Sequence, residues 1–252
     1  MTRILDLLMV AGTAVLSVRL FTIELDRRYR VFFFYLIFET LRNGLLAGLG
    51  SSSGAYQKIW VLTEPIDWVL YVLVVLEIYA LVLADYRGLS TAGRWALIAS
   101  VAIALLASGL TLIAPSQYTA QGPLMRYYYV ADRAVYFSLV VFLISILLFL
   151  MQYPIVLSRN IVVHSMVFSV YFLGNTVIYL ILTMRGRAAL PGVSLALSGV
   201  TVAALGAWLV LLNRAGEIRK VSLRPHWMPG KEEELVSQLN HLNAALLRVT
   251  RK

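Results

Sequence analysis

The chain has 252 residues, of which 60% are hydrophobic and 14% charged, and its formal net charge is +9. Soluble domains are usually about half apolar and about one quarter charged, so this composition excludes an ordinary soluble protein and indicates a helical membrane protein. Cysteine is absent from the sequence, which excludes disulfides, thiolate metal sites and cysteine nucleophiles.

Seven apolar runs of membrane-spanning length follow one another, separated by short segments rich in turn-forming residues. They cover residues of about 4–22, 31–49, 60–84, 94–114, 127–151, 160–183 and 191–212. The sequence therefore predicts an all-α polytopic integral membrane protein in which residues 1–213 form a seven-transmembrane-helix bundle. A basic juxtamembrane linker is expected over 214–230 and a cytoplasmic amphipathic helix over 231–252.

Arginine and lysine predict the orientation of the bundle, because cytoplasmic loops carry an excess of both. With the N-terminus outside and the C-terminus inside (N-out, C-in), the inner loops hold Arg27, Arg28, Arg30, Arg87, Arg94 and Arg159. The loop "RGRAALPG" disagrees, since its two arginines would lie outside. The basic residues serve orientation, so no nucleic-acid partner is expected. Their bias toward arginine, 18 to 4, is typical of GC-rich bacteria. We expect the plasma (inner) membrane of a prokaryote.

The second span carries Glu39 and Arg42, which lie three residues apart and so share a helix face. A charged side chain at the bilayer centre costs at least ~2.5 kcal/mol, so both groups should face protein or water and find partners. Two interpretations remain open. The pair is a clamp that fixes helix packing, or it is part of a ligand or proton site.

The third span carries three acids in different settings. Pro65 suits the first turn of a helix, which would make Glu64 and Asp67 partly N-terminal capping residues. Asp67 and Tyr71 lie four apart on one face, and Glu77 lies deeper, where we expect a buried neutral or paired acid.

Adjacent Asp132 and Arg133 in the fifth span point about 100° apart, so one of them should face inward. Together with Asn175, deeper in the sixth span, the charges of spans 2, 3 and 5 predict an outward-facing polar cavity or a salt-bridge network. His164 in the sixth span is expected to be structural. The last span carries Gly199, Ala203 and Ala207 at four-residue spacing, a packing face or a dimer seam.

No lysine lies in the last span, which excludes a retinal Schiff base, and we expect no cofactor and no metal site. In the tail, the apolar residues recur at spacings of four and three, typical of a short coiled-coil seam: Leu235, Leu239, Leu242, Leu246 and Val249. This seam predicts either docking of a cytoplasmic or membrane protein partner, self-association into a homo-oligomer, or packing on the membrane or under the bundle.

The leading functional hypothesis is a seven-helix membrane sensor or interaction module, with a polar cavity and a C-terminal helix that couples to a partner. A small transporter or channel that moves ions or protons is the main alternative, and a structural subunit of a larger membrane complex is the third. Enzyme activity is not favoured, because HExxH, GxSxG and Gly-rich phosphate motifs are absent from the sequence.

Overall fold

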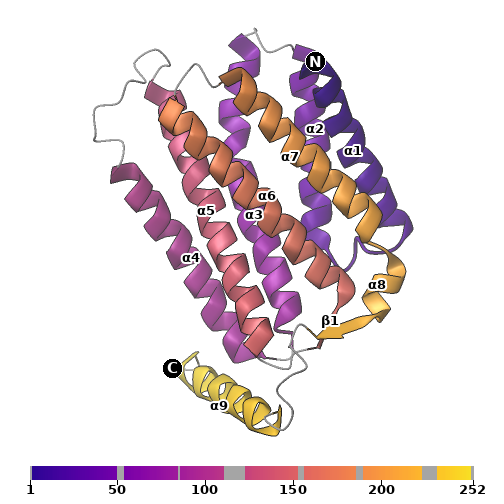
Figure 1. The fold of residues 1–252 in the computed structure, drawn as a ribbon, viewed down its shortest axis with the longest axis vertical. Helices are drawn as coiled ribbons and strands as arrows, with labels where there is room; N and C mark the ends of the chain where they lie inside the picture. The colour runs from indigo at the N-terminus through magenta and orange to yellow at the C-terminus, as the bar shows by residue number, and fades with distance from the viewer. Residues whose placement is uncertain are drawn as a thin grey trace.

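A computed structural model describes residues 2–49, 54–84, 86–110, 123–152, 156–185, 190–222 and 232–250. Long helices lie where the sequence predicts them (Figure 1), with the following bounds: α1 Thr2–Thr22, α2 Arg30–Leu49, α3 Gly54–Val82, α4 Arg87–Leu110, α5 Pro123–Gln152, α6 Arg159–Arg185 and α7 Leu190–Leu211. The tail adds helices α8 (Arg214–Ile218) and α9 (Glu232–Thr250), and strands β1 (Val156–Ser158) and β2 (Lys220–Ser222) complete the described elements.

Within this described part of the chain, five helices are long and apolar enough to cross a membrane. They are Arg30–Leu49, Gly54–Val82, Tyr128–Met151, Arg159–Leu182 and Gly192–Leu211, and a shorter apolar helix, Leu7–Thr22, lies within α1. This pattern supports an all-α, multi-pass membrane protein.

The long helices pack side by side as one bundle (Figure 1). Helix α1 contacts α2 and α7, α2 contacts α3, and α3 contacts both α5 and α6. Helices α5 and α6 pack together, α4 covers the outside of α5, and α7 closes the bundle against α6. Lipid is as apolar as leucine, so these contacts rest on close side-chain packing rather than on hydrophobic transfer.

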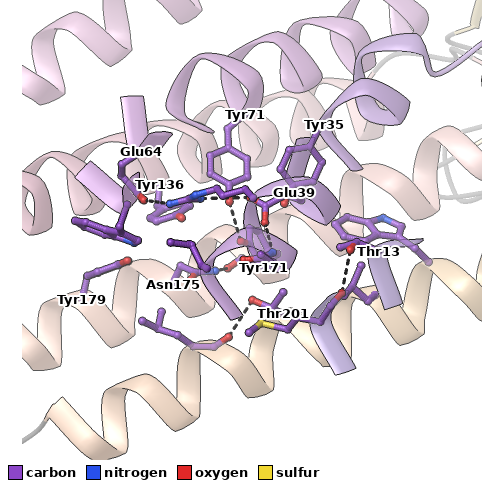
Figure 2. Close-up of a pocket in the computed structure, with 18 of the residues that line it drawn as sticks. Thr13, Tyr35, Glu39, Glu64, Tyr71, Tyr136, Tyr171, Asn175, Tyr179 and Thr201 are labelled. Atoms are coloured by element: carbon purple, nitrogen blue, oxygen red, sulfur yellow. Dashed lines mark hydrogen bonds and ion pairs between the residues drawn. The ribbon is translucent and has the colours of Figure 1, made fainter. Parts of the chain in front are cut away.

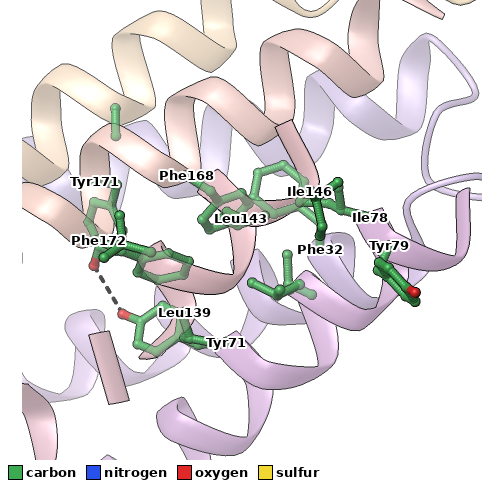
Figure 3. Close-up of a cluster of buried hydrophobic side chains, with 14 of the residues drawn as sticks. Phe32, Tyr71, Ile78, Tyr79, Leu139, Leu143, Ile146, Phe168, Tyr171 and Phe172 are labelled. Atoms are coloured by element: carbon green, nitrogen blue, oxygen red, sulfur yellow. Dashed lines mark hydrogen bonds between the residues drawn. The ribbon is translucent and has the colours of Figure 1, made fainter. Parts of the chain in front are cut away.

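Interlocking aromatic and aliphatic side chains fill the centre of the bundle (Figure 3). Phe32 of α2 meets Phe168 of α6 edge to face, with ring centroids 5.7 Å apart, and Phe168 stacks on Phe172 at 5.3 Å. Leu139 and Leu143 of α5 are fully buried beside them. Edge-to-face and offset contacts are the favoured geometries of aromatic rings, and they fix how α2 and α6 sit against each other.

Pro65 lies in the interior of α3 and not in its first turn, because the helix begins at Gly54. The prediction that Glu64 and Asp67 cap this helix is therefore wrong. Both residues lie beyond its second turn, and both are buried inside the bundle. The polar segment before Trp60 concealed the true start, since residues such as Gln57 and Lys58 read as a loop yet continue the helix outward.

The small-residue stripe of α7 does not form a packing face within the bundle. Gly199 and Ala203 are exposed, and a methyl group added at Gly199 would meet no described atom within 4 Å. Close approach occurs instead at Gly12 of α1 and Gly174 of α6, which face the larger side chains of α7. The stripe as a dimer seam stays a prediction.

The linker after α7 is more structured than its composition predicts. Strand β2 pairs antiparallel with β1, with Val156 opposite Ser222, and the Arg159 amide donates to the Arg219 carbonyl at 2.9 Å. Asn213 caps α8 by accepting from the Gly216 amide at 2.6 Å. Strands of three residues are too short for a periodic sequence signal, so this ribbon was not predicted.

Helix α9 packs against α4 (Figure 1). Leu239 is buried in the core cluster and Leu246 packs against it. These two members of the predicted seam thus contact the bundle, one of the arrangements that the sequence left open. The side chains of Leu235, Leu242 and Val249 lie outside the described residues.

Candidate functional site

A cavity of about 180 Å³ lies inside the bundle, between α1, α2, α3, α5, α6 and α7 (Figure 2). Glu39, near the middle of α2, forms part of its wall, and Tyr56 and Trp60 near the start of α3 line it as well. The cavity therefore extends from mid-bundle toward the end at which α3 begins. Thr13 of α1 and Thr201 of α7 contribute hydroxyl groups on another side (Figure 2).

Arg42 is the cation at this site, and its guanidinium is occupied by neighbours. It forms ion pairs with Glu64 and Asp67 of α3, and its Nε donates to the Thr63 hydroxyl at 2.9 Å. Glu39 lies farther away, with its Oε1 at 3.6 Å from Nη1 of Arg42. The predicted Glu39–Arg42 pair thus exists, but the nearer partners of Arg42 are the acids of the neighbouring helix.

Glu39 has its strongest contact within its own helix. Its Oε2 accepts a hydrogen bond of 2.6 Å from the Asn43 amide, and the residue is 8% exposed. Arg42 has nearer acidic partners, so of the two described acids that line the cavity, Glu39 has the negative charge that is less neutralised by Arg42.

Asp132 is the inward-facing member of the Asp132–Arg133 pair, as one of them was expected to be. It is fully buried, and its Oδ1 accepts a hydrogen bond of 2.6 Å from the Trp68 indole N–H. Its carboxyl group also interacts with that of Glu64. Arg133 is only half-buried and forms no ion pair with a described residue.

Tyrosine rings make up much of the cavity wall: Tyr35, Tyr71, Tyr136, Tyr171 and Tyr179 (Figure 2). The hydroxyl groups of Tyr71 and Tyr171 share a hydrogen bond of 3.0 Å. The Tyr71 ring lies 5.4 Å from that of Tyr35 and 5.5 Å from that of Tyr136, and Tyr136 stacks on Tyr179 at 5.7 Å. These rings come from four different helices and enclose one space.

Of these rings, only Tyr71 was predicted from the sequence, although the sequence contains a signal for the others. Each tyrosine lies four residues from a polar intramembrane side chain, as Tyr35 does from Glu39 and Tyr136 from Asp132. Residues four apart share a helix face, so a ring at that spacing must face the same interior as the polar group. Asn175 lies between Tyr171 and Tyr179 in the sequence, and its side-chain amide donates to the Tyr171 backbone carbonyl at 2.7 Å.

Glu77 lies apart from the cavity. It is ten residues beyond Asp67 on α3, about 15 Å along the helix axis. Its two carboxylate oxygens accept from the amides of Val31 at 2.9 Å and Phe32 at 3.1 Å. These are unpaired N–H groups of the first turn of α2, so Glu77 is an N-terminal cap supplied by a neighbouring helix.

A chain of buried rings leads from the cavity to the tail. Trp208 lines the cavity, and His164 lies 5.9 Å from it, 4.4 Å from Phe32 and 5.3 Å from Tyr29 between ring centroids. The Tyr29 hydroxyl then donates to Glu217 of α8 at 2.8 Å. Burial, followed by the negative charge of Glu217, raises the pKa of the Tyr29 phenol well above its usual value.

Among the described residues, no group of three or more His, Asp or Glu side chains is arranged to hold a metal ion. Comparisons with protein-family models, with curated proteins and with solved structures find no match for this chain.

Proposed function

We propose that this protein is a seven-span membrane sensor, oriented N-out and C-in, whose cavity binds a small ligand and whose tail transmits the bound state to a cytoplasmic partner. The membrane would be the plasma membrane of a bacterium. One observation carries the proposal: the cavity and the tail are joined by continuous packing through Trp208, His164, Tyr29 and Glu217. Contiguous packed side chains are a physical route by which one site biases another.

Basic residues support the orientation. The segment between α1 and α2, which leads into α2, strand β1, which leads into α6, and strand β2 lie at one end of the bundle (Figure 1). This end carries Arg28, Arg30 at the start of α2, Arg159 at the start of α6 and Lys220 in β2. An end with clustered arginine and lysine is expected to face the cytoplasm. The cavity extends toward the opposite end, so its ligand would come from outside.

A set of contacts, which we call the latch, holds the tail against the bundle at α8: Tyr29–Glu217, Arg28–Glu217 and Arg19–Leu212. Glu217 accepts from Tyr29 and also pairs with Arg28, whose Nε lies 2.7 Å from the Glu217 carboxylate. Arg19 donates to the Leu212 carbonyl at 3.0 Å, where α7 ends. A shift of α7 or α6 at the cavity would therefore change the contacts that hold α8 and the strand β2 that follows it.

The coupling can be tested in the full chain because it contains no native cysteine, so two introduced cysteines label cleanly. Spin labels at Ile98→Cys on α4 and Val236→Cys on α9 report tail docking as a distance distribution. The cavity variant Trp208→Phe and the latch variant Tyr29→Phe should each shift that distribution, and their effects should be non-additive in a double-mutant cycle.

Tyr128→Phe is the matched control, since its hydroxyl donates to the Val61 carbonyl away from the latch. It should leave the distribution unchanged. Additive effects of the two test variants, or no shift with Trp208→Phe, would contradict the sensor proposal.

A proton-coupled transporter is the second candidate, favoured by the surplus of buried carboxyl groups. Among the described residues, Glu39, Glu64 and Asp67 are buried around the guanidinium of Arg42, and Asp132 is buried beside Glu64. Intramembrane acids of this kind also serve proton relays. Proton flux into liposomes that is abolished by Glu39→Gln would support the transporter, and absence of flux the sensor.

A further inference from the structure

We propose that the ligand of this cavity is a small organic cation, an amine or a quaternary ammonium ion, which is held by the Glu39 carboxylate and surrounded by tyrosine rings. This inference rests on the proposed function, because it takes the cavity to be a ligand site.

The charges around the cavity disfavour an anionic ligand. Arg42, the cation of this site, already directs its donors at Glu64, Asp67 and Thr63. Among the described residues, Glu39 and Glu64 line the cavity, and Asp67 and Asp132 are buried behind it. If all four carboxyl groups were ionised, they would exceed the Arg42 guanidinium by three negative charges. An anion would add to this excess in a low-dielectric interior, whereas a cation would reduce it.

The rings of the wall favour an organic cation over a hydrated metal ion. An aromatic face carries negative charge density, and it attracts an ammonium group within about 6 Å of its centroid. Tyr35, Tyr71, Tyr136 and Tyr171 are buried rings with neighbouring centroids 5.4 to 6.3 Å apart, so one cation can contact several faces. Apolar ring carbons suit N-methyl or methylene groups, which a metal ion lacks.

Hydrogen-bonding groups at the wall add selectivity. The hydroxyls of Tyr71 and Tyr171 are paired with each other, and the Asn43 amide is paired with Glu39. Trp208 lines the cavity and is 2% exposed, and its indole N–H has no acceptor in the described part of the chain. A buried donor without an acceptor costs free energy, and a hydroxyl group on the ligand would supply the acceptor.

The volume sets the size of the ligand. The cavity has a volume of about 180 Å³, whereas drug-sized ligands occupy cavities of about 300–1,000 Å³. The ligand therefore has only a few carbon atoms, which is the scale of a short amine or a hydroxyalkyl ammonium ion such as choline.

The test is thermal stabilisation of the full chain in nanodiscs, measured with isosteric probes that differ in charge. Choline and a series of alkylammonium ions are the cations, 3,3-dimethylbutan-1-ol is the neutral isostere of choline, and 3,3-dimethylbutanoate is the anion. A ligand that binds the folded state raises the melting temperature according to its occupancy. We expect millimolar cation to raise it and the neutral and anionic probes to leave it unchanged.

Variants assign the binding to this cavity. Glu39→Gln should weaken cation binding by about tenfold or more, because it removes a charged partner. Tyr136→Leu should weaken it while Tyr136→Phe, which keeps the ring, should not. Glu24→Gln is the control, since the Glu24 side chain is 68% exposed and lies just after the end of α1, away from the cavity lining.

The outcomes separate this inference from the proposed function. Cation-selective binding that Glu39→Gln weakens supports both. Binding of the neutral or anionic probe that Tyr136→Leu abolishes shows a ligand site of another class, which overturns the inference and leaves the sensor proposal standing. If no probe of any charge shifts the melting temperature, the inference and the ligand site on which it rests are both wrong.

Discussion

Arg42→Met tests how the buried charges are held. The substitution keeps a long side chain but leaves Glu64 and Asp67, which are 5% and 1% exposed, without the cation that each contacts. Removing one partner of a buried ion pair typically costs about 3–5 kcal/mol, because the remaining charge stays desolvated and uncompensated. Two acids depend on this one guanidinium, so the upper half of that range is expected.

Glu39→Gln provides the contrast. The Glu39 carboxylate lies 3.6 Å from Arg42, which keeps two nearer acids when Glu39 is neutralised, and a glutamine oxygen can still accept from Asn43. We therefore expect a loss of no more than about 1 kcal/mol, the scale of a single hydrogen bond. A large effect of Glu39→Gln on ligand binding with a small effect on stability would mark it as a binding residue.

The assay is thermal unfolding in nanodiscs, followed by tryptophan fluorescence. For a chain of this size, 3–5 kcal/mol corresponds to a fall of roughly 6–20 °C in melting temperature. The triple variant Arg42→Met, Glu64→Gln, Asp67→Asn should recover much of that loss, since the two acids in closest contact with Arg42 then carry no uncompensated charge. Equal losses for Arg42→Met and Glu39→Gln would refute this account of the charges, as would a triple variant no more stable than Arg42→Met.

Further predictions follow from contacts outside the cavity. Glu77→Ala should destabilise the fold by about 0.5–2 kcal/mol through loss of the α2 cap, seen as faster amide exchange in the first turn of α2, and an unchanged exchange rate would contradict it. The raised pKa of Tyr29 means that its contribution to stability is fully present below its ordinary value of 10.0 and is lost as pH rises above it. The difference in melting temperature between the native chain and Tyr29→Phe should therefore stay constant from pH 8 to about 10 and begin to narrow by pH 11, and a gap that widens there would show the sign to be wrong. Gly206→Ala, where an added methyl group meets no described atom within 4 Å, should raise stability by about 0.5–1 kcal/mol, and Gly174→Ala should gain less because its methyl group would lie 3.2 Å from a neighbouring side chain.

The local sequence was a good guide to which polar residues of the helices are buried and a poor guide to their partners. Glu39, Asp67 and Asp132 were singled out because a charge in an apolar run must find a polar or charged neighbour. Periodicity along one helix can pair only residues of that helix, so it predicted Glu39 as the ion-pair partner of Arg42. The acids of α3 lie nearer, and only the packing of α2 against α3 shows this.

Glu77 and Tyr29 show the same limit. A lone acid deep in an apolar helix indicates burial, yet its partners are backbone amides 46 and 45 residues earlier in the chain. The Tyr29 hydroxyl donates a hydrogen bond to Glu217, which lies 188 residues later in the sequence, and no spacing rule can predict such a contact.

The sequence by itself determined the helical membrane class, the approximate ends of the long helices and the polar residues that must face inward, because each follows from how single residues partition between lipid, water and protein. The tertiary structure decided which inward-facing groups meet. It arranged tyrosines from four helices around one cavity, paired Arg42 with the acids of α3, and linked the cavity to α8 through rings in tilted contact. Those outcomes depend on the rotation and spacing of helices relative to one another, which side-chain packing sets and which the pattern along any one helix does not contain.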